Sequence, residues 1–224
     1  MVALMHPFAP RWLRIVLLFV SLAALAQEII GITPEQVAKL AAQFGPVAKT
    51  RLTGWREILT NPKYRKLPEE EKLRLVNDFM NLTQFIGDLK HWGKEDYWAT
   101  PIEFLSTDAG DCEDYSIAKY FTLRALGVPD EKLRITYVKE LVVYNEPHMV
   151  LAYFPTPDAE PVVLDNINPT IRPASQRTDL LPVYSFNGSG LWLAKEQTGR
   201  GQSVGGSDRI GHWRDLQARL RSAM

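Results

Sequence analysis

Apolar residues recur at helical spacing through the first half of the chain. A short helix is predicted from Thr33, because a proline follows this candidate N-cap, and the pair Gly45-Pro46 ends it. A longer helix is predicted from about Pro68 to Gly87. Its apolar stripe consists of Leu75, Phe79, Leu82 and Ile86. Both helices are expected to build the core.

The second half of the chain changes to alternating apolar residues rich in β-branched side chains. Proline, asparagine, aspartate and glycine turns separate the predicted strands at residues 133–143, 148–154, 161–167, 183–186 and 191–195. Helices followed by strands with short connections predict an α+β domain. Its antiparallel sheet is expected to pack on a helix that starts at Cys112.

The connector at residues 88–107 is rich in large aromatic side chains and contains Pro101, which we expect to break any helix. The aromatic residues are Trp92, Tyr97, Trp98 and Phe104. A loop with this composition either lines a cleft or fills the core.

The N-terminus differs from the rest of the chain. Two arginines, an apolar run at residues 15–26 and an Ala-Leu-Ala ending predict a secretory signal at residues 1–26. An uncleaved anchor is the alternative. Export would place Cys112, the single cysteine, in an oxidising compartment without an intramolecular disulfide partner, which invites a functional explanation.

The composition is that of a globular protein. The 224 residues are 46% hydrophobic, which suffices for one domain with a sizeable core, expected at residues 27–196. The 26 basic and 26 acidic side chains balance, so charge gives no support to a nucleic acid partner. Residues 197–208 have the composition of a flexible linker. An amphipathic helix is predicted at residues 209–224, which either docks on the domain or binds a partner.

Cys112 occupies the predicted start of a helix. Asp111 fits the N-cap, and Asp114 three residues later completes a capping box. The thiol would then lie at the positive end of the helix dipole, which favours the reactive thiolate. A small buried hydrophobic side chain is the alternative role for this cysteine.

A histidine and an aspartate on adjacent predicted strands complete an acyl-transfer set. His148 opens one strand and Asp165 ends the next, and a hairpin centred near residue 157 would place His148 opposite Asn166 or Ile167. The imidazole could then exchange a proton with Cys112 while Asp165 orients it. Asn166 competes with Asp165 for the orienting role.

Three acids crowd the turn that carries the sulfur. Asp111, Glu113 and Asp114 would raise the pKa of the Cys112 thiol unless a cation compensates them. Clustered carboxylates offer the hard oxygen ligands that calcium prefers, so they are candidate calcium ligands. Capping acids in solvent are the alternative.

Four motifs carry a resemblance to a known family. They read DYWATP at 96–101, GDCEDY at 110–115, PHMVL at 147–151 and LDN at 164–166. In this order and spacing they resemble the bacterial transglutaminase-like cysteine proteinases, specifically the LapG-type periplasmic adhesin-releasing proteases. The similarity spans about residues 30–195.

The resemblance implies a papain-like or transglutaminase-like fold and calcium bound by the acids beside the cysteine, here Asp111, Glu113 and Asp114. It also implies a periplasmic endopeptidase that cuts the N-terminal region of a large surface adhesin after paired alanines and so promotes biofilm dispersal. The inhibitory partner implied is the periplasmic domain of an inner-membrane cyclic-di-GMP receptor.

In the endopeptidase, the oxyanion hole is expected to include the Cys112 N–H and a donor from the connector. Two other functions fit the same residues. A transferase or amidase of this fold would use the same thioester chemistry of Cys112, His148 and Asp165. A non-enzymatic module would use the acidic turn only to hold calcium.

Overall fold

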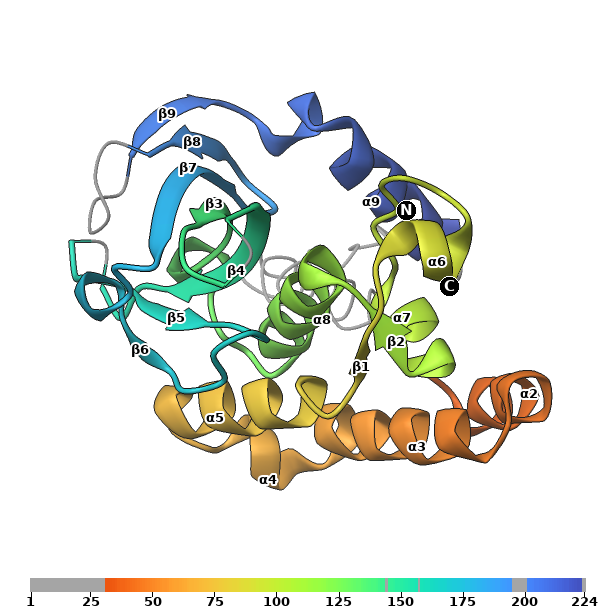
Figure 1. Cartoon of the computed structure of the whole chain (residues 1–224). Coiled ribbons are helices and arrows are strands. Elements are labelled where there is room, and N and C mark those ends of the chain that lie inside the picture. The colour runs from red at the N-terminus through yellow and green to blue at the C-terminus, as the bar shows by residue number, and fades with distance from the viewer. Residues whose placement is uncertain (1–30, 144, 157, 195–200, 223–224) are drawn as a thin grey trace, which may run out of the picture.

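Helices pack on both an antiparallel sheet and one another in the computed structural model of this protein (Figure 1). The structure describes residues 31–143, 145–156, 158–194 and 201–222. The predicted signal at residues 1–26 therefore lies outside the described residues. Within those residues, every helix is too short or too polar to cross a membrane.

Helix α8, which starts at Cys112, is the central helix of the fold. The described part of the chain forms the helices α2 (Pro34–Phe44), α3 (Pro46–Thr60), α4 (Pro62–Arg65), α5 (Glu69–Met80), α6 (Asp88–Trp92), α7 (Pro101–Thr107), α8 (Cys112–Ala125) and α9 (Gly211–Ser222). Short 3₁₀ turns occur at η1 (Asp130–Lys132), η2 (Ala174–Gln176) and η3 (Ser207–Arg209). In Figure 1, α8 lies between the sheet and the layer formed by α3 and α5.

The strands form one antiparallel sheet of order β6-β5-β4-β3-β7-β8-β9 and a small parallel pair, β1-β2. They are β1 (Gln84–Phe85), β2 (Ala109–Gly110), β3 (Leu133–Glu140), β4 (Pro147–Tyr153), β5 (Val162–Leu164), β6 (Arg172–Pro173), β7 (Leu180–Phe186), β8 (Leu191–Leu193) and β9 (Gln202–Gly205). The expected α+β architecture, with the Cys112 helix packed on an antiparallel sheet, is confirmed.

The core lies between α8 and the sheet and continues to the helical layer. Its largest fully buried side chains include Trp55, Phe104 and Trp213. The indole N–H of Trp55 donates to Thr122 Oγ1 at 2.9 Å, so this polar group is satisfied inside the core. The packing fixes α8 against β4, and the start of α8 therefore has a defined position.

The helical layer differs from the sequence prediction in two places. The pair Gly45-Pro46 ends α2 as expected but immediately begins α3, because proline is favourable at the first helical position. Helix α5 ends at Met80, and it buries Leu73, Val76 and Met80 where the prediction had the stripe that includes Leu82. Leu82 lies beyond the helix and is 63% exposed.

The aromatic connector is partly helical, which corrects the expected loop. Pro101 begins α7, where its missing N–H costs nothing, and Thr100 forms a capping box with Glu103. Trp98 and Phe104 are buried, whereas Tyr97 and Trp92 are half-buried.

The C-terminal segment docks on the domain. Residues Gln202–Gly205, expected as linker, form strand β9 beside β8, because a glycine-rich backbone can still pair at a sheet edge. Trp213, Leu216 and Leu220 of α9 are buried in the core. Of the two readings left open for this helix, the structure shows docking.

Candidate active site

Cys112 is the first residue of α8, directly after strand β2. Asp111 is the N-cap, and the Asp114 carboxylate accepts the Asp111 N–H at 3.3 Å, so the predicted capping box is confirmed. Gly110 permits this close turn, because a Cβ there would lie 2.5 Å from Asp114 Oδ2.

Cys112 and His148 line the same cavity, although 36 positions separate them in the sequence. The cavity has a volume of about 180 Å³. Its other lining residues are Phe85, Glu140, Glu146, Pro147 and Ile167. Glu146, from the loop after β3, brings this loop to the rim of the cavity. The buried Glu140 carboxylate holds the loop, because it accepts the N–H groups of Val142 and Val143 at 2.8 and 2.9 Å. These bonds also explain why β3 ends at Glu140, short of its predicted end.

His148 is hydrogen-bonded to Asp165. The imidazole Nε2 lies 2.8 Å from Asp165 Oδ1, and both side chains are almost fully buried. Leu151 pairs with Leu164 between β4 and β5, and continuing this register places Ile167 opposite His148, as the hairpin prediction requires. Asp165, and not Asn166, is the partner of the imidazole.

The Asp165 carboxylate is ionised in this environment. Burial favours the neutral acid, but the hydrogen bonds and charges of His148 and Arg177 outweigh it and hold the pKa of Asp165 well below its usual range. The neighbouring backbone is pinned as well, since Asn81 Nδ2 of the chain after α5 donates to the Asp165 carbonyl at 2.8 Å. The acceptor for the imidazole is therefore charged and fixed.

The thiol of Cys112 is not activated by the helix dipole alone. Burial raises its pKa well above the ordinary value, and the negative charge of Glu113 raises it further. The thiol donates to Glu113 Oε2 at 3.1 Å, which stabilises the protonated form. The N–H of Met149 opposes this shift and lowers the pKa.

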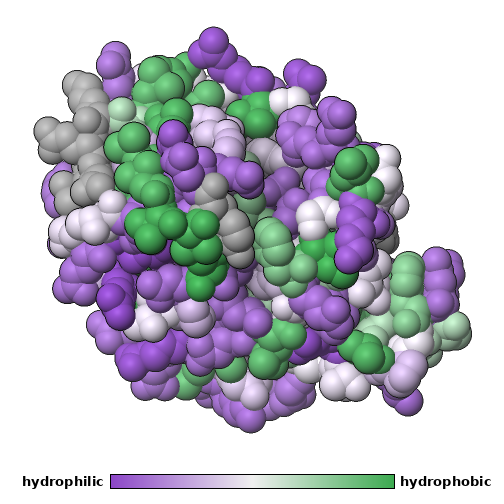
Figure 2. Space-filling model, in the orientation of Figure 1, coloured by the Kyte–Doolittle hydropathy of each residue, from purple (hydrophilic) through white to green (hydrophobic). Residues whose placement is uncertain are grey.

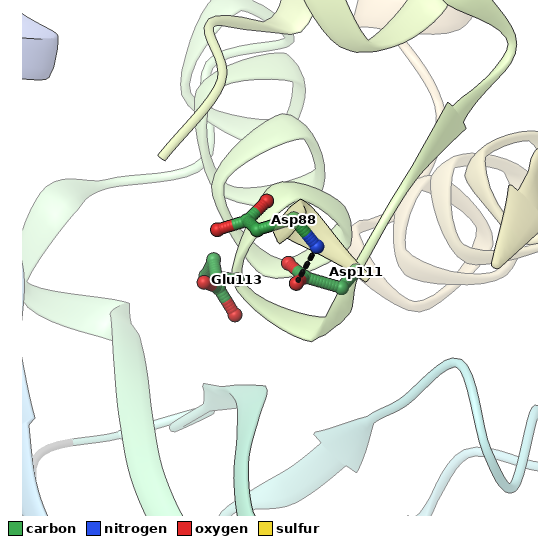
Figure 3. Close-up of side chains that lie close together, drawn as sticks. All are labelled: Asp88, Asp111 and Glu113. Carbon is green, nitrogen blue, oxygen red and sulfur yellow. Dashed lines mark hydrogen bonds between the residues drawn. The ribbon is translucent and has the colours of Figure 1, made fainter. Parts of the chain in front are cut away.

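Three carboxylates converge beside the cysteine: Asp88, Asp111 and Glu113 (Figure 3). Each offers an oxygen within 4.8 Å of the others. The Asp88 N–H donates to Asp111 Oδ2 at 3.3 Å, and the Tyr97 N–H donates to Asp88 Oδ2. Among the described residues, Asp88 Oδ1 and Asp111 Oδ1 are buried without a hydrogen-bond partner. Unpaired buried oxygens of this kind fit a divalent cation that prefers hard ligands.

The crowding of the acids disfavours their charged forms. Burial, together with the charge of Glu113, raises the pKa of Asp88 to about 6 and that of Asp111 to about 9. The N–H of Tyr97 opposes the shift at Asp88. A cation between these groups would reverse the shift, because it favours the ionised carboxylates.

The acidic cluster differs from the expected set in one member. Asp111 and Glu113 belong to it, but the Asp114 carboxylate lies outside it and accepts the N–H groups of Ala99, at 2.7 Å, and of Asp111. Asp88 takes its place. The parallel pairing of Phe85 with Gly110 brings Asp88 beside Asp111, and this long-range pairing of two-residue strands left no signal in the sequence.

The fold is that of the transglutaminase-like cysteine proteinases. The chain belongs to the bacterial transglutaminase-like cysteine proteinases, whose family model matches residues 60–194. No curated protein matches the chain.

Solved structures of LapG from Legionella pneumophila are similar to this chain. One is 42% identical, with a TM-score of 0.71, and the match covers 85% of this chain and 98% of LapG. A calcium-bound LapG structure is also 42% identical, with a TM-score of 0.71 and coverage of 84% and 99%. An EGTA-treated LapG structure has the same identity and a TM-score of 0.72, with coverage of 85% and 98%.

Proposed function

We propose that this protein is a calcium-dependent periplasmic cysteine endopeptidase with the triad Cys112, His148 and Asp165. The observation that carries the proposal is the hydrogen-bonded pair of His148 and Asp165 at a cavity that Cys112 also lines. Membership of a cysteine proteinase family supports peptide-bond hydrolysis.

In this mechanism, His148 takes the proton of Cys112 and the sulfur attacks the scissile carbonyl carbon. Nε2 is committed to Asp165, so Nδ1 is the nitrogen that exchanges the proton. Cys112 is the first residue of α8, so its backbone N–H has no partner within the helix and is the donor we assign to the developing oxyanion. His148 then protonates the leaving amine, and a thioester forms. His148 next takes a proton from water, and the resulting hydroxide attacks the thioester carbon. The C–S bond breaks, the acyl fragment leaves as a carboxylic acid, and His148 returns the proton to the Cys112 sulfur.

Calcium is proposed at the cluster of Asp88, Asp111 and Glu113. The two unpaired buried oxygens support this assignment, and a calcium-bound structure exists for the similar LapG. When bound, the ion supplies positive charge beside Cys112, which favours the thiolate. The acids themselves hold the loop after β1 against the start of α8.

The substrate we propose is the N-terminal region of a large cell-surface adhesin, released to promote biofilm dispersal. Similarity to LapG supports this, since the resemblance is to adhesin-releasing proteases. A polypeptide substrate also suits the rim of the cavity, where Phe85 is an exposed apolar residue. Apolar side chains gather over the strand-rich side of the molecule (Figure 2).

The proposed inhibitory partner is the periplasmic domain of an inner-membrane cyclic-di-GMP receptor. The resemblance to LapG-type proteases supports this partner. The proposed location is the periplasm, which the secretory pattern at residues 1–26 supports.

The test is incubation of the purified mature protein with the N-terminal part of the large adhesin of the same organism and an added primary amine, with calcium or with chelator. Mass spectrometry is expected to show two fragments, in calcium only, whose masses sum to the substrate plus one water. An intact substrate that carries the amine would instead identify an acyltransferase. An unchanged substrate in calcium would favour the non-enzymatic module.

A further inference from the structure

We propose that Arg177 is a positioning residue of the active site. It binds one oxygen of the Asp165 carboxylate and fixes its orientation, so that His148 is the only charged group that binds the other oxygen among the described residues. This inference rests on the proposed triad. Arg177 lies outside the four sequence motifs, in the connection between β6 and β7.

The two oxygens of Asp165 have separate partners. Oδ1 accepts from His148 Nε2 at 2.8 Å and from the Ile167 N–H at 3.0 Å. Oδ2 accepts from Arg177 Nη2 at 2.7 Å. A carboxylate held at both oxygens cannot rotate about its Cβ–Cγ bond without losing a charge-assisted hydrogen bond, so its orientation toward the imidazole is fixed.

Arg177 is itself held in place. Asp179 accepts from its Nε at 2.9 Å and from its Nη2 at 2.7 Å. The Arg177 N–H donates to the carbonyl of Ala174, the first residue of η2, and the Arg177 carbonyl accepts from the N–H of Leu180 at the start of β7. The side chain is 2% exposed. This planar fork with two carboxylate partners is a geometry that arginine provides and lysine does not.

Arg177 and the imidazole of His148 both interact with the negative charge of Asp165. Several charged groups surround His148 and Asp165. Arg177 approaches from the β6–β7 connection, Lys119 and the Cys112 thiol approach from α8, and Glu140 and Glu146 lie on the rim of the cavity. Without the positive charge of Arg177, the negative charge of Asp165 acts on His148 without compensation, which favours the imidazolium.

A purely structural role predicts a different result. A buried arginine that only ties two connections together would lower stability when replaced, without moving the titration of His148. The pKa of His148 is therefore the discriminating quantity. It can be followed by NMR of the imidazole in a Cys112→Ala background, where it depends neither on substrate nor on the thiol.

The experiment compares Arg177→Met and Arg177→Lys, each with Cys112→Ala. In Arg177→Met we expect the imidazole of His148 to stay protonated to a higher pH than in the parent, because a positive charge is lost near its carboxylate partner. Arg177→Lys keeps the charge and is expected to stay near the parent. His91 and His212 give internal control signals in the same spectra, and Arg172→Met removes an exposed arginine of β6 as a matched control. Lys119 is a second cation near Asp165, and Lys119→Met measures how far its charge affects the titration of His148.

The same substitutions are made with Cys112 intact. We expect Arg177→Met to lower kcat/KM on the adhesin fragment by on the order of 100-fold, as for a misplaced catalytic group, and Arg177→Lys to recover part of it. If Arg177→Met does not fold, Asp179→Asn, which loosens the arginine, takes its place.

An unmoved His148 titration in a folded Arg177→Met protein overturns the proposal. A wild-type protein that cleaves no adhesin defeats the proposed function instead. The NMR comparison remains valid in that case, because it requires no substrate.

Discussion

The backbone N–H of Asp88 donates to the carboxylate of Asp111 at 3.3 Å, which joins the chain after β1 to the N-cap of the cysteine helix. Both residues carry a buried oxygen without a hydrogen-bond partner among the described residues. This relationship links the candidate calcium site to the position of Cys112.

Asp88→Asn should abolish stabilisation by calcium. A ligand that binds only the folded state stabilises it, so calcium at the proposed site should raise the Tm of the wild type, and loss of one of the three carboxylates should remove that rise. Thermal unfolding with calcium and with chelator measures the effect, and Asp215→Asn, an exposed acid of α9, is the control. Glu113→Ala should also lose the calcium-dependent rise. A wild-type Tm indifferent to both calcium and chelator would refute the metal site.

Asp114→Asn should behave differently from Asp88→Asn. Asp114 accepts two backbone N–H groups and lies outside the acidic cluster, so its replacement removes a buried acceptor and costs roughly 1–3 kcal/mol. We expect a lower Tm in calcium and in chelator alike, with the calcium-dependent difference retained. Loss of that difference would return Asp114 to the ligand set.

In the metal-free protein, Asp111 and Asp88 should contribute more stability as the pH falls from about 9 toward 4. The pKa values of Asp111 and Asp88 are raised to about 9 and about 6 in the folded state, so the folded protein binds protons more tightly than the unfolded chain. Stability from these groups is present below their unfolded pKa values and is lost as the pH rises through the folded values. Urea unfolding in chelator across this range measures the trend, and Asp88→Asn should flatten its lower part. A stability that falls steadily from pH 9 to pH 6 would contradict it.

Glu113→Gln should lower the pKa of the Cys112 thiol in the presence of chelator. Burial raises this pKa most, and the charge and hydrogen bond of Glu113 raise it further. The ultraviolet absorbance of the thiolate as a function of pH gives the value, with Cys112→Ala as the blank. Glu146→Gln removes another acid that lines the cavity and serves as the matched control. An unchanged or higher thiol pKa in Glu113→Gln would contradict the electrostatic explanation.

Trp213→Ala should destabilise the domain by about 3–5 kcal/mol, the usual cost of truncating a buried aromatic side chain. The indole is 1% exposed and stacks on Phe121 of α8 with ring centroids 5.6 Å apart. Urea unfolding measures the change, and Arg214→Ala on the exposed side of α9 is the control. A loss below about 1 kcal/mol would show that α9 contributes little to the core.

Local patterns predicted the cysteine helix, its capping box and the strands that carry His148 and Asp165. Those features depend on neighbouring residues and on one hairpin register. Asp88 and Arg177 could not be predicted in the same way, because each reaches the site through a long-range connection, the β1–β2 pairing for one and the β6–β7 connection for the other. Strand β9 was missed because its glycine-rich composition is also that of a linker.

In the proposed mechanism, Cys112 cuts a peptide chain with the help of His148. The most direct measurement is the intact mass of the adhesin fragment after incubation in calcium with wild type, Cys112→Ala and His148→Ala. We predict two fragments with the wild type and an uncut substrate with both variants, each variant being folded by circular dichroism. Cleavage by Cys112→Ala at the wild-type rate would contradict the claim.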